Sequence, residues 1–309
     1  MPDNTAVAIL LATYNGEKYL SELFDSLLKQ TYKNWKLYIH DDGSKDNTLS
    51  IINEFVAEHP LYAEYVEGPP TGGAKNNFLF LVKKIESEIY MFCDQDDVWL
   101  PDKIEATLKG MESLKEKADC PCLVHTDLKI VDEKLDIIAD SMEQYQKLHS
   151  KDNSVNHLLV ENVVTGCTAM INRNLRDKMI EFTNIDNIIM HDWWAALIAA
   201  QFGEILFIPN ATILYRQHGN NTIGAKKTGF WDCFKVFKGS KRNHIRNLLK
   251  MGRAQAKELS SAFKLNESSL ASIYANVSEY NKLKRICIYI KHNFKANTFL
   301  RTLGLYVLG

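Results

Sequence analysis

The sequence predicts an α/β fold: a mainly parallel sheet within residues 1–222, followed by a basic helical segment over residues 223–309. Three observations support this prediction. Short apolar runs alternate with segments of helical period, which is typical of βαβ units and a parallel sheet. Polar clusters directly follow three of the apolar runs. The chain of 309 residues is 46% hydrophobic and 24% charged, as in globular proteins that bury a sizeable core.

Alternating strands and helices are predicted from the N-terminus. The apolar run Val7–Ala12 is typical of a strand that is buried on both faces. Apolar residues then recur at positions i, i+3, i+4, i+7 and i+8 from Leu20 to Leu28, which predicts an amphipathic helix. The same patterns predict, in order, a strand at 35–40, a helix around 51–56, a strand at 62–66, a Gly/Pro-rich loop at 68–73, a helix at 78–85 and a strand at 89–93.

The pattern continues less regularly beyond residue 100. It predicts a helix at 103–114, a strand at 123–131, a strand at 163–171 that contains Gly166, a helix at 191–202 and short strands at 205–208 and 212–215. No run approaches the roughly 20 apolar residues of a transmembrane helix. The first apolar stretch is too short for a signal peptide, and six cysteines without framework spacing indicate reduced thiols, so we expect a cytoplasmic protein.

Three carboxylates follow the strand predicted at 89–93. Asp94, Asp96 and Asp97 would repel one another if they were unpaired, and each would raise the pKa of the others. A divalent cation with oxygen ligands removes that repulsion, so the cluster predicts bound Mg²⁺ or Mn²⁺. A helix N-cap is the alternative, but it accounts for one Asp rather than three.

The other two clusters, 13–15 and 41–44, fall at the ends of neighbouring predicted strands. Ligands bind where the carboxyl ends of parallel strands meet. Asp-Asp-Gly-Ser at 41–44 is by itself ordinary turn chemistry. Together with the carboxylates at 94–97 it favours a nucleotide-diphosphate site. The chain has no dinucleotide-binding or P-loop glycine motif, which disfavours those two classes.

Five motifs in order along the chain resemble the family-2 glycosyltransferases, and within them the bacterial rhamnosyltransferases that build cell-wall and capsular polysaccharides. The motifs are Ala12-Thr-Tyr-Asn-Gly16, Asp41-Asp-Gly-Ser44, Cys93-Asp-Gln-Asp-Asp-Val-Trp99, His191-Asp-Trp-Trp194 and Tyr215-Arg-Gln-His-Gly-Asn-Asn221. The resemblance covers about residues 5–225. It implies a GT-A (Rossmann-like) fold, a nucleotide-sugar donor and inversion at the anomeric carbon.

The resemblance also implies roles for individual residues. Asp192 matches the general base, although His191 stands where the family commonly has Glu, and a mechanism based on His191 stays open. Asp94 and Asp96 match the family's DxD metal motif, with Asp96 as the more direct ligand. The residues implied at the nucleotide are Thr13, Asn15, Asp41 at the base, Lys75, Asn76 and Asn77 near the ribose or phosphates, and Asp94.

Residue chemistry supports further candidates. Asp192 begins an otherwise apolar helix, so partial burial can raise its pKa and suit it to accept a proton, although a plain N-cap is the alternative. Arg216 suits a diphosphate because it is always charged and forms paired hydrogen bonds. His218 is a candidate third metal ligand or a surface turn residue. Candidates to contact the sugar are Trp99 and one of Trp193 and Trp194, with the other in the core. His191 is a further candidate on the acceptor side, and the resemblance implies Gly166 there, because Thr165-Gly166 resembles the family's acceptor-side turn.

The two parts of the chain carry opposite charge. Residues 1–225 have a net charge of −14 and residues 226–309 a net charge of +13. The stretch 282–309 has six basic residues and no acidic residue, among many apolar ones. This composition favours contact with an anionic membrane surface, and the alternative is a packed helical cap with a solvated basic face. Nucleic acid is not expected, because no recognised binding motif accompanies the charge.

The sequence therefore predicts a glycosyltransferase that moves L-rhamnose from dTDP-L-rhamnose to a lipid-linked precursor of a cell-surface polysaccharide. We expect it at the inner face of the cell membrane, as a peripheral protein. Three alternatives stay open: transfer of another hexose from a UDP-sugar, hydrolysis of the nucleotide sugar, and a catalytically silent sugar-nucleotide-binding protein. The sequence indicates no particular oligomeric state.

Overall fold

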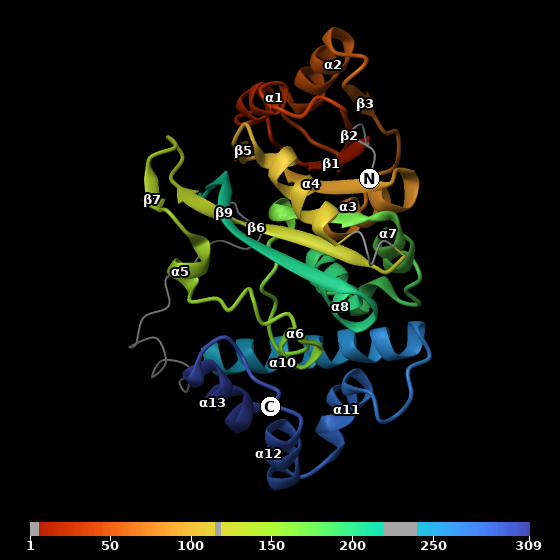
Figure 1. Cartoon of the computed structure of the whole chain (residues 1–309), viewed down its shortest axis with the longest axis vertical. Helices are drawn as coiled ribbons and strands as arrows, with labels where there is room; N and C mark the ends of the chain where they lie inside the picture. Colours follow the sequence, from red (N-terminus) through yellow and green to blue (C-terminus); the bar gives the residue numbers. More distant parts are fainter. Residues whose placement is uncertain (1–5, 115–118, 219–239) are drawn as a thin grey trace.

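A mixed sheet of nine strands forms the centre of the computed structural model (Figure 1). The structure describes residues 6–114, 119–218 and 240–309. The strand order is β3-β2-β1-β4-β8-β6-β9-β5, and β7 pairs with β6 beside this path. The strands are β1 (Val7–Thr13), β2 (Trp35–Asp41), β3 (Ala63–Tyr65), β4 (Ile89–Asp94), β5 (Val98–Trp99), β6 (Cys122–Val131), β7 (Ile137–Ala139), β8 (Ala169–Asn172) and β9 (Glu204–Arg216).

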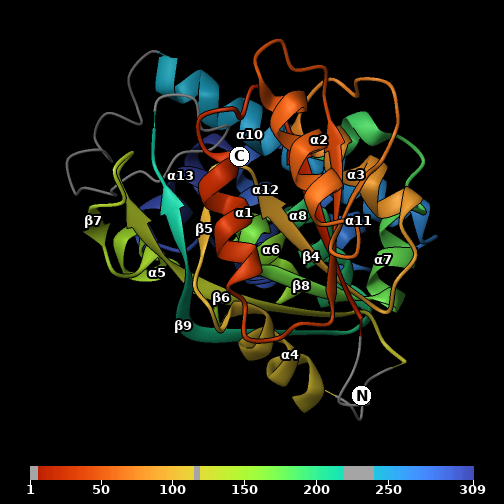
Figure 2. The same ribbon diagram turned by 90° about the horizontal axis from the view of Figure 1, so that it is seen from above.

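Helices cover both faces of this sheet, which confirms the predicted α/β class. Along β1, Ala8 and Leu10 belong to one buried cluster, and Val7, Ile9 and Leu11 belong to the other. This alternation is the two-residue period of a strand that is buried on both faces. The first cluster is covered by α3 (Ala74–Lys84), α7 (Arg173–Met179) and α8 (His191–Phe202), and the second by α1 (Leu20–Leu28), α2 (Thr48–Glu58) and α4 (Lys103–Ser113) (Figure 2).

Strand register brings the polar clusters to one edge of the sheet. β1 pairs in parallel with both β2 and β4. Thr13 lies beside Asp41, and Ala12 lies beside Asp94, so the three carboxyl ends are level. The predicted meeting of the three polar clusters at one edge of the sheet is therefore confirmed.

Four predicted elements differ from the structure. The helix predicted from residue 78 begins at Ala74, because the Asp42 carboxylate accepts the N–H groups of Gly72 and Gly73 and fixes the turn that precedes it. The strand predicted at 163–171 is a single turn of 3₁₀ helix at Gly166–Thr168, followed by β8. The two strands predicted between 205 and 215 are the single strand β9, whose register against β6 shifts around Pro209 and Asn210.

The C-terminal segment packs into the same core as the sheet. The predicted boundary between residues 222 and 223 lies outside the described residues. Beyond it, α10 (Ser240–Ala262) contributes Ala256 and Leu259 to the cluster that also holds Trp194 of α8. The remaining elements are α5 (Met142–Gln146), α6 (Val155–Leu158), α11 (Leu270–Asn276), α12 (Lys282–Lys291), α13 (Phe299–Leu308) and single 3₁₀ turns at Ile185–Asn187 and Val277–Glu279.

Two buried side chains of α10 hold the loop that leads into α8. Glu258 accepts hydrogen bonds from the backbone N–H groups of Thr183 and Asn184 and from the side chain of Asn187. Gln255 accepts the N–H of Ile189 at 2.8 Å. Burial opposes ionisation of Glu258, but these hydrogen bonds outweigh it and lower the pKa of the carboxyl group. The C-terminal segment thus helps to fix the start of α8.

The Glu258→Gln substitution should therefore destabilise the protein at neutral pH. It replaces an ionised acceptor with a neutral one, and we expect a loss of about 1–3 kcal/mol in the free energy of unfolding. Chemical denaturation measures this loss, and Glu267→Gln, at an exposed position, is the control.

The destabilisation should also depend on pH. Folding lowers the pKa of Glu258. The stability that ionised Glu258 adds to the folded state is therefore complete above the pKa that Glu258 has in the unfolded chain, and it is lost as pH falls through its pKa in the folded state. The difference between wild type and Glu258→Gln should shrink in acid. Equal stability of the two proteins at pH 7 would show that Glu258 does not brace the loop.

Candidate functional site

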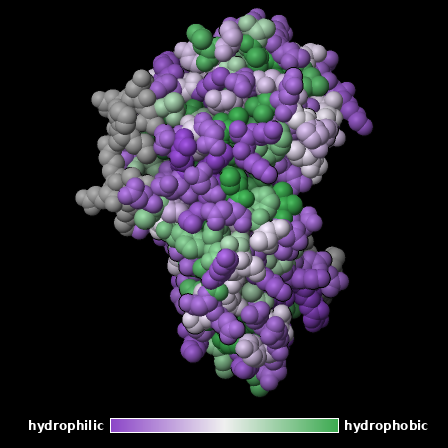
Figure 3. All heavy atoms as spheres, turned by 90° about the vertical axis from the view of Figure 1, so that its right-hand side faces the viewer, coloured by the Kyte–Doolittle hydropathy of each residue, from purple (hydrophilic) through white to green (hydrophobic). Residues whose placement is uncertain are grey.

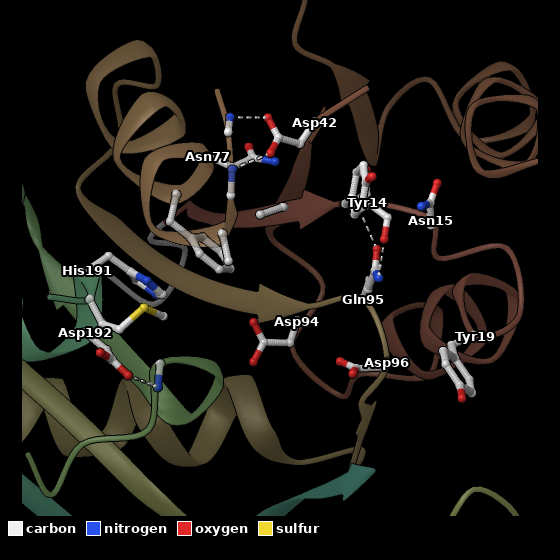
Figure 4. A pocket seen from close by; sticks show the side chains of 18 of the residues that line it. Tyr14, Asn15, Tyr19, Asp42, Asn77, Asp94, Gln95, Asp96, His191 and Asp192 are labelled. Carbon is white, nitrogen blue, oxygen red and sulfur yellow. Dashed lines mark hydrogen bonds between the residues drawn. The ribbon is translucent and has the colours of Figure 1, made fainter. Parts of the chain in front are cut away.

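A pocket of about 800 Å³ opens at the carboxyl ends of β1 and β4. Its volume is within the usual range for sites that bind small molecules and cofactors. Asp94 and Asp96 lie on one side, and His191 and Asp192 face them from the start of α8 (Figure 4). The predicted site residues that line the pocket are Thr13, Asn15, Asn77, Asp94, Asp96, Gly166, His191, Asp192 and His218.

Asp94 and Asp96 direct carboxylates into the pocket (Figure 4). Burial, together with the negative charges of Asp96 and Asp192, raises the pKa of Asp94 to about 7. Asp96 contacts His218, with 2.8 Å between Oδ2 and Nε2. Oxygen ligands under mutual repulsion suit Mg²⁺ or Mn²⁺, so the residues fit the predicted cation. Asp94 and Asp96 would hold it, with His218 adjacent.

A second group of ligand atoms lies beneath the pocket. Carboxylate and thiol atoms of Asp94, Asp97 and Cys167 are within 4.8 Å of one another. Asp97 and Cys167 do not line the pocket, and both are buried. Burial lowers the pKa of the nearby Lys103 to about 8, while Asp97 and two thiols favour its charged form. Burial and the charges of Asp96 and Asp94 also raise the pKa of Asp97 well above its ordinary value, and Asp94 and Asp96 are the two acids that face the ligand space.

Asp192 is held by the turn around Gly166. Its Oδ2 accepts the Gly166 N–H at 3.0 Å, and its Oδ1 accepts the N–H of Trp193. Burial raises the pKa of Asp192 to about 6, although these hydrogen bonds lower it in part. Glycine is required at position 166, because an added Cβ would lie 2.8 Å from the His191 ring.

His191 occupies an aromatic enclosure. Its ring stacks on Phe78 with centroids 4.1 Å apart and meets the edge of Phe92 at 4.7 Å. Burial lowers the pKa of His191 to about 3, so the ring is neutral at neutral pH. His191 is therefore a much weaker base than Asp192.

At the end of β2, the pocket-lining residue is Asp42 rather than Asp41. The Asp41 carboxylate is buried and accepts hydrogen bonds from Thr13, from Ser44 and from the N–H of Gly43. It organises the turn, so the structure does not support the predicted contact of Asp41 with a base. Asp42 lines the pocket and fixes the loop before α3.

Of the predicted residues 75–77, only Asn77 lines the pocket. Lys75 donates to the carbonyl oxygens of Ile185 and Ile188, and Asn76 donates to the carbonyl of Thr71. Both lie in the first turn of α3 rather than in a loop. Neither Lys75 nor Asn76 lines the pocket in this structure, so their approach to a nucleotide stays a prediction.

The prediction that one of Trp193 and Trp194 lies in the core is confirmed for Trp194, but none of the three predicted tryptophans reaches the pocket. Trp99 and Trp194 are fully buried, and Trp194 donates to the carbonyl of Met179. Trp193 is half-buried and donates to the carbonyl of Leu158 at 2.6 Å. Trp99, Trp193 and Trp194 do not line the pocket, so they do not cover a sugar in it.

Arg216 braces the acidic turn instead of lining the pocket. Its guanidinium donates to the carbonyls of Asp96 and Glu133 and pairs with Glu22. Only 2% of the residue is exposed. The prediction that Arg216 contacts a diphosphate directly is therefore not supported, and its structural effect is to position Asp96.

Several pocket residues were not predicted from the sequence. Gln95 accepts the Tyr14 N–H and donates to the Tyr14 carbonyl, which fastens the loop after β1 to the acidic turn. Tyr19 stacks on His218 with centroids 5.0 Å apart. The position of Gln95 inside the acidic motif was the one signal that could have identified it. The pocket-lining residues missed include Tyr14, Tyr19, Asp42, Phe78, Gln95, Met190 and Tyr215.

Comparison with known proteins gives close matches in sequence. Over 230 residues the chain is 31% identical to "dTDP-rhamnosyl transferase RfbG" of Shigella flexneri, covering 70% of this chain and 74% of that protein. Over 111 residues it is 37% identical to "UDP-Glc:alpha-D-GlcNAc-diphosphoundecaprenol beta-1,3-glucosyltransferase WfgD" of Escherichia coli, covering 35% of this chain and 42% of that protein.

Solved structures share the fold. TarS 1-349 of S. aureus, in complex with UDP-GlcNAc, has a TM-score of 0.54 at 17% identity and covers 93% of this chain and 79% of its own. The mannosyltransferase PcManGT of Pyrobaculum calidifontis, in complex with GDP-Man and Mn²⁺, has a TM-score of 0.50 at 15% identity, covering 97% of this chain and 86% of its own. The fold is thus the GT-A fold. The family model for "Glycosyl transferase family 2" matches residues 8–180, so the chain belongs to glycosyl transferase family 2.

Proposed function

We propose that this glycosyltransferase moves L-rhamnose from dTDP-L-rhamnose to a hydroxyl of a lipid-linked glycan, with inversion and with a divalent cation at Asp94 and Asp96. One observation carries the chemical part of the proposal: Asp192 faces Asp94 and Asp96 across a single pocket (Figure 4). Inverting transfer needs a base on the side of the sugar opposite the departing diphosphate. Lipid-linked acceptors would place the enzyme at the inner face of the cell membrane.

The proposed step forms one C–O bond and breaks another. The acceptor hydroxyl oxygen attacks the anomeric carbon while Asp192 takes the hydroxyl proton. The bond from the anomeric carbon to the diphosphate oxygen breaks, and the diphosphate leaves with the electron pair. A divalent cation held by Asp94 and Asp96 would supply the positive charge that offsets the charge of the departing diphosphate. The Gly166 N–H fixes the Asp192 carboxylate.

The names of two relatives support the identity of the proposed sugar donor. The name of RfbG, which matches 70% of this chain, supports dTDP-rhamnose. The runner-up is a UDP-hexose, because WfgD matches at 37% identity over a shorter stretch. The name of WfgD also supports a lipid-linked diphosphate acceptor. Hydrolysis of the nucleotide sugar needs the same carboxylates and is distinguished by its product.

The Asp192→Asn substitution should abolish turnover while donor affinity is kept. The amide retains the acceptor oxygen for the Gly166 N–H but cannot take a proton, so we expect kcat to fall by about 10²–10⁴. Steady-state kinetics and calorimetric donor binding measure the two effects. Asp186→Asn, an exposed change on the loop before α8, is the control. If His191→Ala removes activity and Asp192→Asn does not, the base is misassigned.

The pH profile should have an acid limb set by Asp192. Because burial raises its pKa to about 6, the carboxyl group is protonated and inactive below that value. At saturating Mn²⁺, kcat/KM should fall about tenfold per pH unit below about 6. His191→Asn should leave the position of the limb unchanged, because the His191 ring is already neutral there. A limb that disappears in His191→Asn would contradict the assignment.

The Asp96→Asn substitution should remove the cation-dependent part of donor binding. In thermal-shift assays we expect Mn²⁺ with dTDP-L-rhamnose to raise the Tm of the wild type, and EDTA or Asp96→Asn to abolish the rise. Stability without cation should not fall, because the substitution relieves repulsion of Asp94. Asp102→Asn, exposed at the start of α4, is the control. A larger shift with UDP-glucose would favour the runner-up donor, and a shift insensitive to EDTA would exclude the cation role.

A further inference from the structure

The outward faces of α12 and α13 are apolar. Leu283 and Ile290 of α12 are 78% and 61% exposed, and Phe299 of α13 is 80% exposed. On α12, exposed Cys287 lies between Leu283 and Ile290 at i+4, so the three form one stripe. A helix that packs on a core normally exposes polar residues instead. The other exposed apolar side chains of α13 are Leu300, Leu303 and Val307.

These exposed residues are not a consequence of poor packing, because the inner faces of both helices are already filled. Tyr289 of α12 and Leu305 of α13 are buried in the main core cluster. Tyr289 stacks on Tyr306 with ring centroids 6.0 Å apart and 8° between the planes. The two helices lie together at the lower end of the molecule (Figure 1), and Figure 3 shows mixed hydrophilic and apolar residues at that end from the side on which α11 lies. Both helices therefore carry an apolar face in addition to the one that the fold uses.

Positive charge accompanies the apolar stripe. Lys282, Lys284 and Lys291 of α12 are exposed, and no acidic residue occurs from 282 to 309. Two basic residues farther along are paired with acids of the main body: Lys295 with Asp152, and Arg301 with Glu161. Within the described residues, no ion pair forms with the three α12 lysines. Lys284 lies over the Tyr280 ring, with 3.9 Å between Nζ and the ring centroid, and this contact leaves its charge without an acidic partner. The three lysines can therefore pair with an anionic partner.

An anionic bilayer matches this combination better than a protein surface. Apolar side chains enter the acyl boundary while flanking lysines reach the lipid phosphates. A second copy of the same face would bring like charges together, which disfavours self-association. In the described part of the chain, no helix is both long and apolar enough to cross a membrane.

We propose that α12 and α13 form a docking face for anionic membranes, with Leu283, Ile290 and Phe299 inserted among the lipids and Lys282, Lys284 and Lys291 at the headgroups. The proposal does not depend on the donor or on the reaction. It concerns the packed C-terminal segment, so it is tested in the full chain.

Flotation with lipid vesicles, in the absence of nucleotide sugar, tests the docking face. The wild type should float with phosphatidylcholine vesicles that contain phosphatidylglycerol, and much less with pure phosphatidylcholine. Added salt should remove part of the binding by screening the lysines, and the apolar contribution should persist. Equal binding to the two lipids, or no binding to either, would overturn the proposal.

Two sets of substitutions locate the face. Leu283→Ser with Ile290→Ser and Phe299→Ser should reduce vesicle binding at least tenfold, while Leu61→Ser, at an 85% exposed residue between α2 and β3, should not. Lys284→Gln with Lys291→Gln should weaken binding to anionic vesicles roughly tenfold. The control removes the same amount of charge elsewhere, with Lys29→Gln at the end of α1 and Lys83→Gln in α3.

Each variant must keep the wild-type Tm and circular dichroism, so that loss of binding is not loss of folding. Where the triple variant does not fold, Ile290→Ser alone gives the test, with a smaller expected loss. Binding that survives in both sets of variants would overturn the docking face. A wild-type dimer that becomes monomeric in the serine variants, without any vesicle binding, would identify a second copy as the occupant and would also overturn it.

Discussion

Repulsion among the carboxylates at the end of β4 is the constraint on which the site depends. Parallel pairing brings this strand end level with those of β1 and β2, so the acids of the turn cannot move apart. The surroundings offset the charge: Arg216 braces the turn through the Asp96 carbonyl, His218 contacts the Asp96 carboxylate, and Lys103 lies below. The pKa values of Asp94 and Asp97 nevertheless stay raised, so the cluster as a whole is short of positive charge, and Asp94 is the one of these two acids that lines the pocket.

The C-terminal segment supports the pocket through α10 and also forms the proposed membrane-docking face on α12 and α13. Glu258 and Gln255 hold the loop at 183–189, and this loop leads directly to His191 and Asp192. A chain cut before α10 would lose that support, so truncation would confuse loss of the membrane face with loss of the site. Point substitutions on the outward faces of α12 and α13 avoid this problem, because those side chains are exposed and the inner faces stay intact.

The sequence predicted the strand ends well, because continuous apolar runs and their polar ends are local signals. β1, β2 and β4 match their predicted ranges within one residue at the carboxyl end. Side-chain direction was harder to predict. Asp41 and Asp42 are neighbours in one turn, and only tertiary contacts decide which enters the pocket. Trp99 and Arg216 have the chemistry of ligand-binding residues, but the folded chain uses them for packing and for bracing the acidic turn.

In the proposed reaction, Asp192 activates an acceptor hydroxyl on the side of the sugar opposite the departing diphosphate. The anomeric configuration of the product reports whether the hydroxyl attacks from that side. Nuclear magnetic resonance of the glycoside made from dTDP-L-rhamnose and a lipid-linked acceptor should show a configuration opposite to that of the donor. A product with retained configuration, or free sugar as the sole product when acceptor is present, would contradict the account.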